Sequence, residues 1–314
     1  MKIKFWLLCS IFFCSCGVQK NRIVSPSGKS ASIKTPPIMV EIDDNFYADK
    51  TEMNNFNYES FVIWAERVYG KNSEQYLFTL PDTAVWLRTP LANGNEKFAP
   101  LFEKLAEVYF QPGSLRNFPV VGISFEQAKA YCHWRGERVL EYILRTKKEI
   151  PIDTLPNSET VFTIEKYYAG KYYDISPDKN IPYPEYTLPT IAEWEKMARG
   201  KSPKNDANFG IDLNKNRLTE NSFPFNIYEY AHRPERDTGQ LSITMPIFSF
   251  PQNDFGVYEV IGNVAEMTAT KGIAKGGSWM HRLDESKISS YQTYKEPASW
   301  LGFRCVCRWK FYEE

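Results

Sequence analysis

The sequence contains few of the residues from which metal and redox centres are usually built. The histidines among its 314 residues are His133, His232 and His281. Half of the six cysteines precede residue 17, and the others are Cys132, Cys305 and Cys307. No cysteine and histidine have the spacing of zinc ligands, so we expect each histidine to be a surface or hydrogen-bonded residue. An oxidising compartment would permit one disulfide among the three later cysteines and leave one thiol over.

The chain also lacks a net charge, a tandem repeat and an internal membrane-spanning run. It has 38 Lys and Arg against 38 Asp and Glu. Removal of the first fifteen residues, with Lys2 and Lys4, leaves two more acidic than basic residues, which gives no support for nucleic-acid binding. Aromatic residues make up 15% of the chain and there are 20 prolines. This composition favours a loop-rich fold stiffened by rings over a helical bundle.

The first residues have the character of an export signal. Basic Lys2 and Lys4 precede an apolar run over residues 5–13, which is too short to span a bilayer as a stable helix. Ser15 precedes Cys16 and Gly17 follows it, an arrangement similar to the lipobox of bacterial lipoproteins, although a phenylalanine replaces the usual leucine at position 13. We therefore predict a lipoprotein signal over residues 1–15 and acylation of Cys16, in preference to an ordinary secretory signal with an incidental cysteine.

Residues 16–37 are predicted to be a flexible tether. They contain almost no large apolar side chains and are rich in serine, lysine and proline, so they would bury too little surface to offset the entropy of ordering. No acidic run follows Cys16. We therefore expect an outer-membrane lipoprotein that faces the periplasm rather than the cell surface, held to the membrane by its lipid anchor.

Residues 38–314 are predicted to form one large domain with an insertion at about 145–186. The insertion is rich in proline and tyrosine and has little periodicity, and loops of this length are usually functional or mobile. Short strands are expected over residues 38–47 and 80–86.

Helix starts are marked by local capping residues. Asn54 or Asn55 would cap a helix that reaches about residue 69, and Ser124 would cap a long helix with Cys132 on or near its buried face. Thr190 and Glu193 have the spacing of a capping box.

Three glycine and aromatic segments lie near the end of the chain, and they form the most distinctive part of the sequence. They are residues 255–267, 275–279 and 301–305. Glu259 and Glu266 flank a turn that contains Gly262 and Val264. On spacing alone, the simpler interpretation is two solvated carboxylates. The alternative is that a tight loop gathers the two carboxylates and the carbonyl oxygens of Gly262 and Val264 around a hard cation such as calcium.

Together, six ordered segments resemble the formylglycine-generating-enzyme, or sulfatase-modifying-factor, domain family. These segments are residues 46–52, 119–125 with 130–134, 188–195, 255–266, 276–279 and 302–305. The resemblance implies an α+β fold, a loop-rich variant of the C-type-lectin-like fold with an insertion. Within that family the chain looks most like the gliding-motility lipoproteins associated with type IX secretion, through residues 80–86, 118–122, 134–144 and 262–266.

The resemblance also implies functional residues. Catalytic members bind copper through two cysteines just beyond a Gly-Gly-Ser-aromatic segment, but residues 279–285 contain no cysteine, so the thiolates of a Cu(I) site are missing. The cleft residues implied at this place are Trp279, His281, Arg282, Asp284 and Glu285, for which a charged surface turn is the simpler interpretation.

Two structural features follow from the same resemblance. Family members join the cysteines at the positions of Cys132 and Cys305, which implies a disulfide here, and Cys307 would point to the other side of a strand as a buried thiol. Family members also hold calcium at the positions of Glu259, Gly262, Val264 and Glu266. That ion would have a structural role, and no cofactor is otherwise required.

The function expected from these observations is that of a non-catalytic, membrane-anchored structural lipoprotein that binds other proteins of the envelope, in a gliding-motility or type IX secretion assembly. The absence of the copper-binding cysteines is the reason for this choice. The alternatives are an enzyme of unknown reaction in the same fold and a glycan- or small-ligand-binding module that uses the tyrosine-rich insertion.

Overall fold

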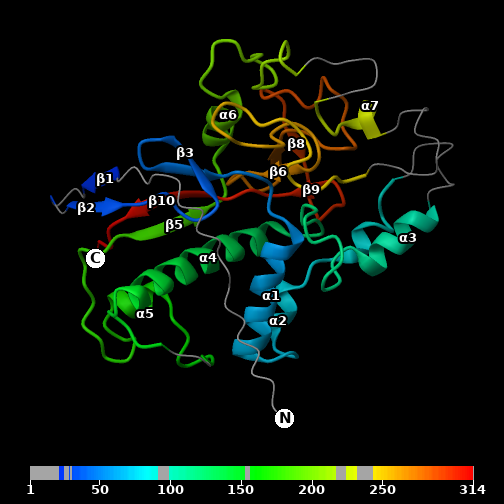
Figure 1. Cartoon of the computed structure of the whole chain (residues 1–314). Helices are drawn as coiled ribbons and strands as arrows, with labels where there is room; N and C mark the ends of the chain where they lie inside the picture. Colours follow the sequence, from blue (N-terminus) through cyan, green and yellow to red (C-terminus); the bar gives the residue numbers. More distant parts are fainter. Residues whose placement is uncertain are drawn as a thin grey trace.

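The computed structural model describes residues 21–24, 28, 30–90, 99–152, 156–216, 224–231 and 243–313, and over these residues it combines helices with two four-stranded sheets (Figure 1). The chain therefore has the expected α+β fold. The predicted signal, Cys16 and His232 lie outside the described residues. Among the residues described, no helix combines the length and apolar character needed to cross a membrane.

The first sheet is entirely antiparallel and has the order β3-β4-β10-β5. Its strands are β3 (Met39–Asp43), β4 (Phe46–Asp49), β5 (Tyr183–Thr187) and β10 (Val306–Lys310). The prediction of one strand over residues 38–47 is wrong, because the chain turns within it to form the β3-β4 hairpin. At the turn, Asn45 has a left-handed φ of 52° and exchanges two hydrogen bonds with the backbone of Trp309.

The second sheet is smaller and contains the distinctive C-terminal segments. Its order is β8-β7-β6-β9, with a parallel pair between β6 and β9. Its strands are β6 (Ala265–Met267), β7 (Ile273–Lys275), β8 (Gln292–Thr293) and β9 (Leu301–Gly302). Because β9 and β10 are separated by only three residues, the chain passes directly from one sheet to the other at residues 303–305.

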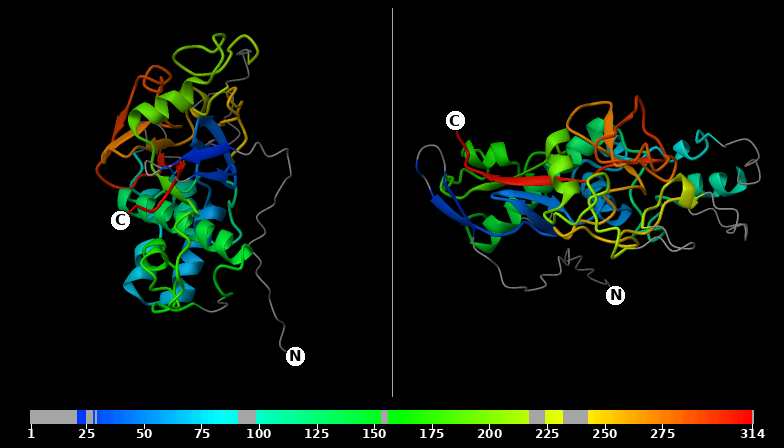
Figure 2. Two further views of the ribbon diagram at one scale, coloured as in Figure 1. Left: turned by 90° about the vertical axis from the view of Figure 1, so that its left-hand side faces the viewer. Right: turned by 90° about the horizontal axis from the view of Figure 1, so that it is seen from above.

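Helices cover both sides of the first sheet. They are α1 (Asn55–Tyr69), α2 (Glu74–Thr79), α3 (Ala99–Val108), α4 (Phe125–Thr146), α5 (Ile164–Tyr168), α6 (Ile191–Arg199) and α7 (Tyr228–Ala231). In Figure 1 and in the left view of Figure 2, α1, α2, α4 and α5 lie below the sheet, whereas α6 and the loops of the C-terminal third lie above it. Separate buried clusters fill the two sides.

Local side-chain caps begin the helices as expected. The Asn54 side chain accepts from the backbone N–H of Asn57, and capping boxes begin α4 at Ser124 and α6 at Thr190. The predicted strand over residues 80–86 is wrong. A 3-10 turn, η1 (Thr83–Val85), lies there because the Asp82 side chain accepts from the backbone N–H of Ala84.

The expected tether is folded where the structure describes it. Residues Asn21–Val24 (β1) and Ser30–Ile33 (β2) form an antiparallel hairpin. Ile23 and Ile33 are buried in the main core together with Trp309, whose indole N–H donates to the carbonyl of Lys34. The prediction of a flexible tether is therefore wrong for residues 21–24 and 30–33, because two isoleucines on one face attach these strands to a core formed elsewhere.

The tyrosines of the insertion serve a structural purpose. Tyr167, Tyr168 and Tyr172 are buried with Phe162 in a cluster that packs against the C-terminal half of α4. Desolvation raises the pKa of each of these tyrosines above its usual value. These three rings are therefore unavailable as the stacking surface of a glycan-binding insertion.

We predict that Ile33→Ala lowers the free energy of unfolding by about 2–4 kcal/mol, because it removes a buried side chain that is only 2% exposed. Val24→Ala, in the partner strand, removes a side chain that is 67% exposed and should change stability by no more than about 0.5 kcal/mol. Urea denaturation measures both. Equal, negligible effects would restore the interpretation of this segment as a tether.

Candidate functional site

The loop before β6 contains three residues with left-handed backbone conformations. Glu259, Gly262 and Asn263 all have positive φ, at 48°, 80° and 58°. A Cβ atom on Gly262 would lie 2.5 Å from the carbonyl oxygen of Asn226, so only glycine fits against that neighbouring segment. The side chains of Glu259 and Asn263 in this tight loop are buried.

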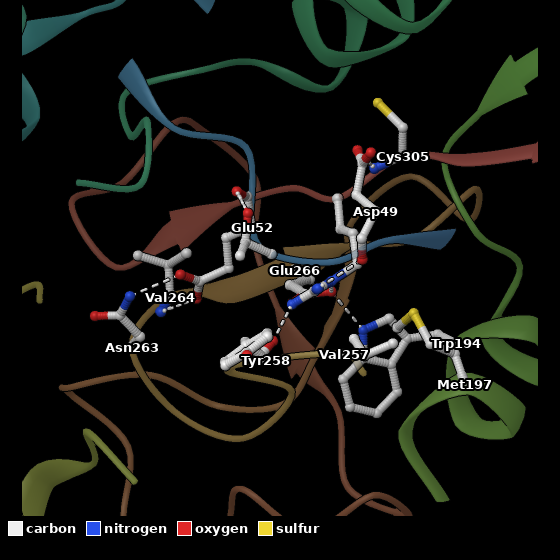
Figure 3. Close-up of polar contacts among 12 residues, drawn as sticks. Asp49, Glu52, Trp194, Met197, Val257, Tyr258, Asn263, Val264, Glu266 and Cys305 are labelled. Atoms are coloured by element: carbon white, nitrogen blue, oxygen red, sulfur yellow. Dashed lines mark hydrogen bonds and ion pairs between the residues drawn. The ribbon is translucent and has the colours of Figure 1, made fainter. Parts of the chain in front are cut away.

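A buried ion pair lies directly beneath the loop. Arg304, between the two sheets, directs its guanidinium at the carboxylate of Glu266 on β6, with nitrogen–oxygen distances of 2.6–3.0 Å. The remaining guanidinium bonds go to the backbone carbonyls of Asp49 and Tyr258. Trp194 of α6 donates its indole N–H to the second oxygen of Glu266 at 2.8 Å (Figure 3). Both charges are fully enclosed, and each is satisfied by its partners.

A second buried carboxylate holds the loop from the other side. The Glu52 carboxylate accepts from the side-chain amide of Asn263 at 2.6 Å and from the backbone N–H of Val264 at 3.0 Å (Figure 3). Burial, together with the nearby carboxylates of Glu259 and Glu266, holds the pKa of Glu52 well above its usual range. Glu52 thus joins the loop to the segment after β4 through two hydrogen bonds.

Glu259 is the least satisfied acid of the group. One of its oxygens accepts from the backbone N–H of Phe250 at 3.1 Å, but the other is buried without a hydrogen-bond partner. Burial raises its pKa from 4.5 to about 7. The interpretation of Glu259 and Glu266 as two solvated carboxylates is therefore wrong, since both are buried.

The residues expected to hold calcium do not fit that ion. Glu266 already accepts from Arg304 and Trp194 through both oxygens. A calcium ion bound to Glu266 would lie beside the positive guanidinium, and the two cations would repel each other in a region of low dielectric constant. The arginine thus supplies the positive charge that the resemblance assigned to a metal ion.

An open cleft lies beyond the β7 strand, at the place where the resemblance predicted functional residues. Its volume is about 500 Å³, and it is lined by His281, Glu285, Ser289, Ser290, Tyr291, Gln292 and Thr293. Gln292 shapes its base, because its side chain donates to the carbonyl of Glu285 and accepts from the backbone N–H of Gly277.

The structure brings only two of the five expected cleft residues to the cleft, His281 and Glu285. Trp279 is buried and stacks against Trp86. Arg282 lies over the ring of Tyr228 at 5.0 Å, away from the cleft lining. Asp284 also lies outside the lining. Sequence reasoning missed residues 289–293, whose only signal is a run of hydroxyl and amide side chains after the charged turn.

Among the residues that line the cleft, His281 is the one whose contacts most resemble those of a catalytic base. Its Nδ1 atom lies 2.7 Å from the hydroxyl of Ser278, but this hydroxyl is completely buried and also accepts from the backbone N–H of Met280. Burial lowers the pKa of His281, so the ring is uncharged near neutral pH. Since Ser278 cannot reach a substrate, the pair fixes the histidine ring and does not form a nucleophile with its base.

The three described cysteines lie in the core, away from the cleft. The sulfur atoms of Cys132 and Cys305 are 3.2 Å apart, and both residues are free thiols in this structure. Cys307 is buried as expected, but its predicted orientation is wrong. It lies in the same cluster as Cys305 and Trp309, whereas Val306 lies in the other cluster. Alternate residues of an extended chain point to the same side.

Comparison with known proteins identifies the family. The sequence model of the sulfatase-modifying factor enzyme 1-like domain matches residues 17–309. The chain belongs to this family. The glycine-rich loop, the Gly-Phe-Arg segment that carries Arg304, and the cleft are thus parts of a sulfatase-modifying-factor domain.

Named relatives differ in activity. The chain is 26% identical over 208 residues to the inactive C-alpha-formylglycine-generating enzyme 2 of Bos taurus, a match that covers 60% of this chain and 50% of the relative. It is 25% identical over 308 residues to the formylglycine-generating enzyme of Mus musculus, with 84% and 66% covered. The chain therefore spans about half to two thirds of these relatives. Treponema denticola variable protein 1 has 15% identity, covers 93% of both chains and has a TM-score of 0.42.

The expected disulfide remains a prediction. In protein isolated from an oxidising compartment, non-reducing peptide mapping should find Cys132 joined to Cys305 and Cys307 free, because the first two sulfur atoms already face each other. The bond would close a loop of well over a hundred residues, with a nominal stabilisation of roughly 3–5 kcal/mol. A link to Cys307, or three free thiols, would contradict it.

We predict that Arg304→Met costs about 3–5 kcal/mol of unfolding free energy, because it leaves the Glu266 carboxylate buried without its counter-charge. The matched control is Arg308→Met. Arg308 pairs with Glu193 at 2.6 Å, but its side chain is 37% exposed, so the loss should be about 1 kcal/mol or less. Denaturant titration compares the two variants, and equal losses would show that the buried pair is not the stabilising contact.

Glu259 should make stability depend on pH. Between pH 4.5 and 7 the folded protein keeps a proton that the unfolded chain has released, so the contribution of Glu259 to stability falls as the pH rises. The full difference is roughly 3 kcal/mol. Glu259→Gln imitates the protonated acid, and its melting temperature should therefore fall less than that of the wild type between pH 5 and 8. The melting temperature of the exposed control Glu107→Gln should change with pH as that of the wild type does. If the melting temperature of Glu259→Gln also changed in parallel with the wild type, Glu259 would not be the group responsible.

Proposed function

We propose that this sulfatase-modifying-factor domain is a non-catalytic structural lipoprotein, anchored through Cys16 to the periplasmic face of the outer membrane, which binds other proteins of an envelope assembly. The observation that carries the proposal is the composition of the cleft, whose lining contains no cysteine. Catalytic members of the family need two thiolates there to bind copper, and His281 with hydroxyl and amide groups cannot replace a soft thiolate pair. No cofactor is required for the proposed role.

Exposed apolar side chains support a protein-binding role. Several of them lie on or near α1 and α2, namely Phe56, Ile63, Leu77, Phe78, Leu80 and Leu87. A groove of about 440 Å³ lies between η1 and α3, and Leu87 and Ala106 contribute to its lining. Large exposed apolar side chains of this kind are available for contact with another protein. The closer likeness to gliding-motility lipoproteins makes a type IX secretion or gliding assembly the proposed setting.

The cleft favours a second candidate function, the binding of a small polar ligand. Tyr291 is 63% exposed at its edge, and Gln292 and Glu285 supply polar groups, which is a combination that suits a glycan. This candidate uses the cleft, whereas protein binding uses the surface of α1 and α2. Variants of the two regions therefore separate the two functions.

The anchor is tested by Cys16→Ser in the producing bacterium. We expect unprocessed precursor that no longer incorporates labelled fatty acid, because serine cannot form the thioether to the lipid. Continued labelling of the variant would disprove the assignment of Cys16.

The binding function is tested by copurification of the full chain from membranes. A partner in fixed stoichiometry should be retained by the wild type and by Tyr291→Ala, and lost from Leu77→Glu/Phe78→Glu, since both replaced side chains are exposed. A small molecule that copurifies with the wild type but not with Tyr291→Ala would favour the second candidate.

A further inference from the structure

A cluster of metal-ligating side chains lies far from the cleft, where the insertion meets α4. His133 and Glu137 are four residues apart on α4 and therefore lie on one face of the helix, and Glu165 reaches them from α5. The Nε2 atom of His133 lies 3.4 Å from a carboxylate oxygen of Glu137 and 3.9 Å from one of Glu165. Within the described ranges, no other group of three or more His, Cys, Asp or Glu residues converges to this extent.

We propose that His133, Glu137 and Glu165 bind a divalent transition-metal ion of the zinc type, which joins the insertion to α4. The three ligand atoms lie within 4.8 Å of one another. A tetrahedral ion with bonds of about 2.0–2.1 Å separates its ligands by about 3.4 Å. The His133–Glu137 distance already has this value, and it exceeds the usual N–H···O hydrogen-bond distance of about 2.9–3.0 Å. The exposed Glu165 side chain needs to move only slightly.

The charges around the cluster also favour a cation. Arg138 is directed elsewhere: it lies 2.8 Å from Glu141, donates to the carbonyl of Phe162 and is 3.7 Å from Glu137 at its closest. Arg145 also pairs with Glu141. Glu141 thus has two close guanidinium partners, whereas the Glu137 side chain, which is only 7% exposed, lies 3.4 Å from the imidazole and 3.7 Å from the nearest guanidinium nitrogen. When that imidazole is neutral, Glu137 and Glu165 place two negative charges beside it, and a divalent ion balances both.

The elements that carry the ligands are held in place by their own packing. The Thr163 side chain accepts from the backbone N–H of Lys166 and so fixes the turn of α5 that carries Glu165. Tyr167 and Tyr168 of the same helix pack with Leu140 of α4. A site built on packed helices needs little rearrangement to bind its ion.

The side chains of the cluster indicate which kind of metal ion it would bind. One imidazole and two carboxylates suit zinc and its neighbours in the transition series, while magnesium and calcium prefer sites made only of oxygen. Because His133 and Glu165 are exposed, the site opens to solvent and leaves the fourth position to water. The competing account is an ion pair between His133 and Glu137 that needs no metal.

The test is isothermal titration of the full chain with Zn²⁺ after treatment with a chelator, with Mg²⁺ as the control ion. We expect one Zn²⁺ per chain, and His133→Gln and Glu165→Gln should each weaken binding by at least about tenfold, since loss of an outer partner alone costs roughly 10–100-fold. Glu159→Gln, an exposed glutamate of the same insertion, should bind as the wild type does. Circular dichroism checks that each variant is folded.

Limited proteolysis gives a second readout. Trypsin cleavage within the insertion, at Lys171 and Lys179, should become slower when Zn²⁺ is added to the wild type, because the ion holds α5 against α4. Glu165→Gln should lose this protection and Glu159→Gln should keep it. Absence of stoichiometric Zn²⁺ binding by the wild type, or undiminished binding by both His133→Gln and Glu165→Gln, would overturn the proposal and leave the ion pair.

Discussion

The buried pair between Arg304 and Glu266 is the contact on which the arrangement of the two sheets depends. Arg304 lies in the short connection between β9 and β10, and its guanidinium reaches the carboxylate on β6 as well as the carbonyls of Asp49 and Tyr258. Withdrawing two charges from water costs several kcal/mol for each ion, which is offset only when every donor has a partner. The pair therefore defines one relative placement of β4, the loop before β6 and the C-terminal strands.

The same network continues into the helices. The carboxylate of Asp49 accepts two bonds from Arg135 of α4, at 2.7 and 2.8 Å, and one from the backbone N–H of Cys305. On the other side, Trp194 joins α6 to Glu266. One chain of charged hydrogen bonds thus connects a helix below the first sheet with a helix above it. The residues of this network are not among those that line the cleft, and membership of the family does not by itself establish an activity.

The starts of helices were the part of the structure that the sequence predicted best. Asn54, Ser124 and Thr190 begin helices because each side chain satisfies an N–H group within three residues of itself, and such a signal is complete in a short stretch of sequence. Residues 21–24 and 30–33 show the opposite case. Their composition is that of a tether, but the surface that buries Ile23 and Ile33 comes largely from distant parts of the chain, including Trp309 and Phe311.

The sequence by itself determined the family, the α+β class, the helix starts and the absence of thiols from the cleft, because these depend on residue identity and short spacing. Only the tertiary structure decided the state of the acidic residues. Glu266 is neither solvated nor free for calcium, because its partner Arg304 is 38 residues away along the chain. Nor could spacing show that Glu165 meets His133, since that approach depends on how the insertion folds back onto α4. A charged side chain acquires its role from the groups that enclose it, and only the folded chain brings those groups together.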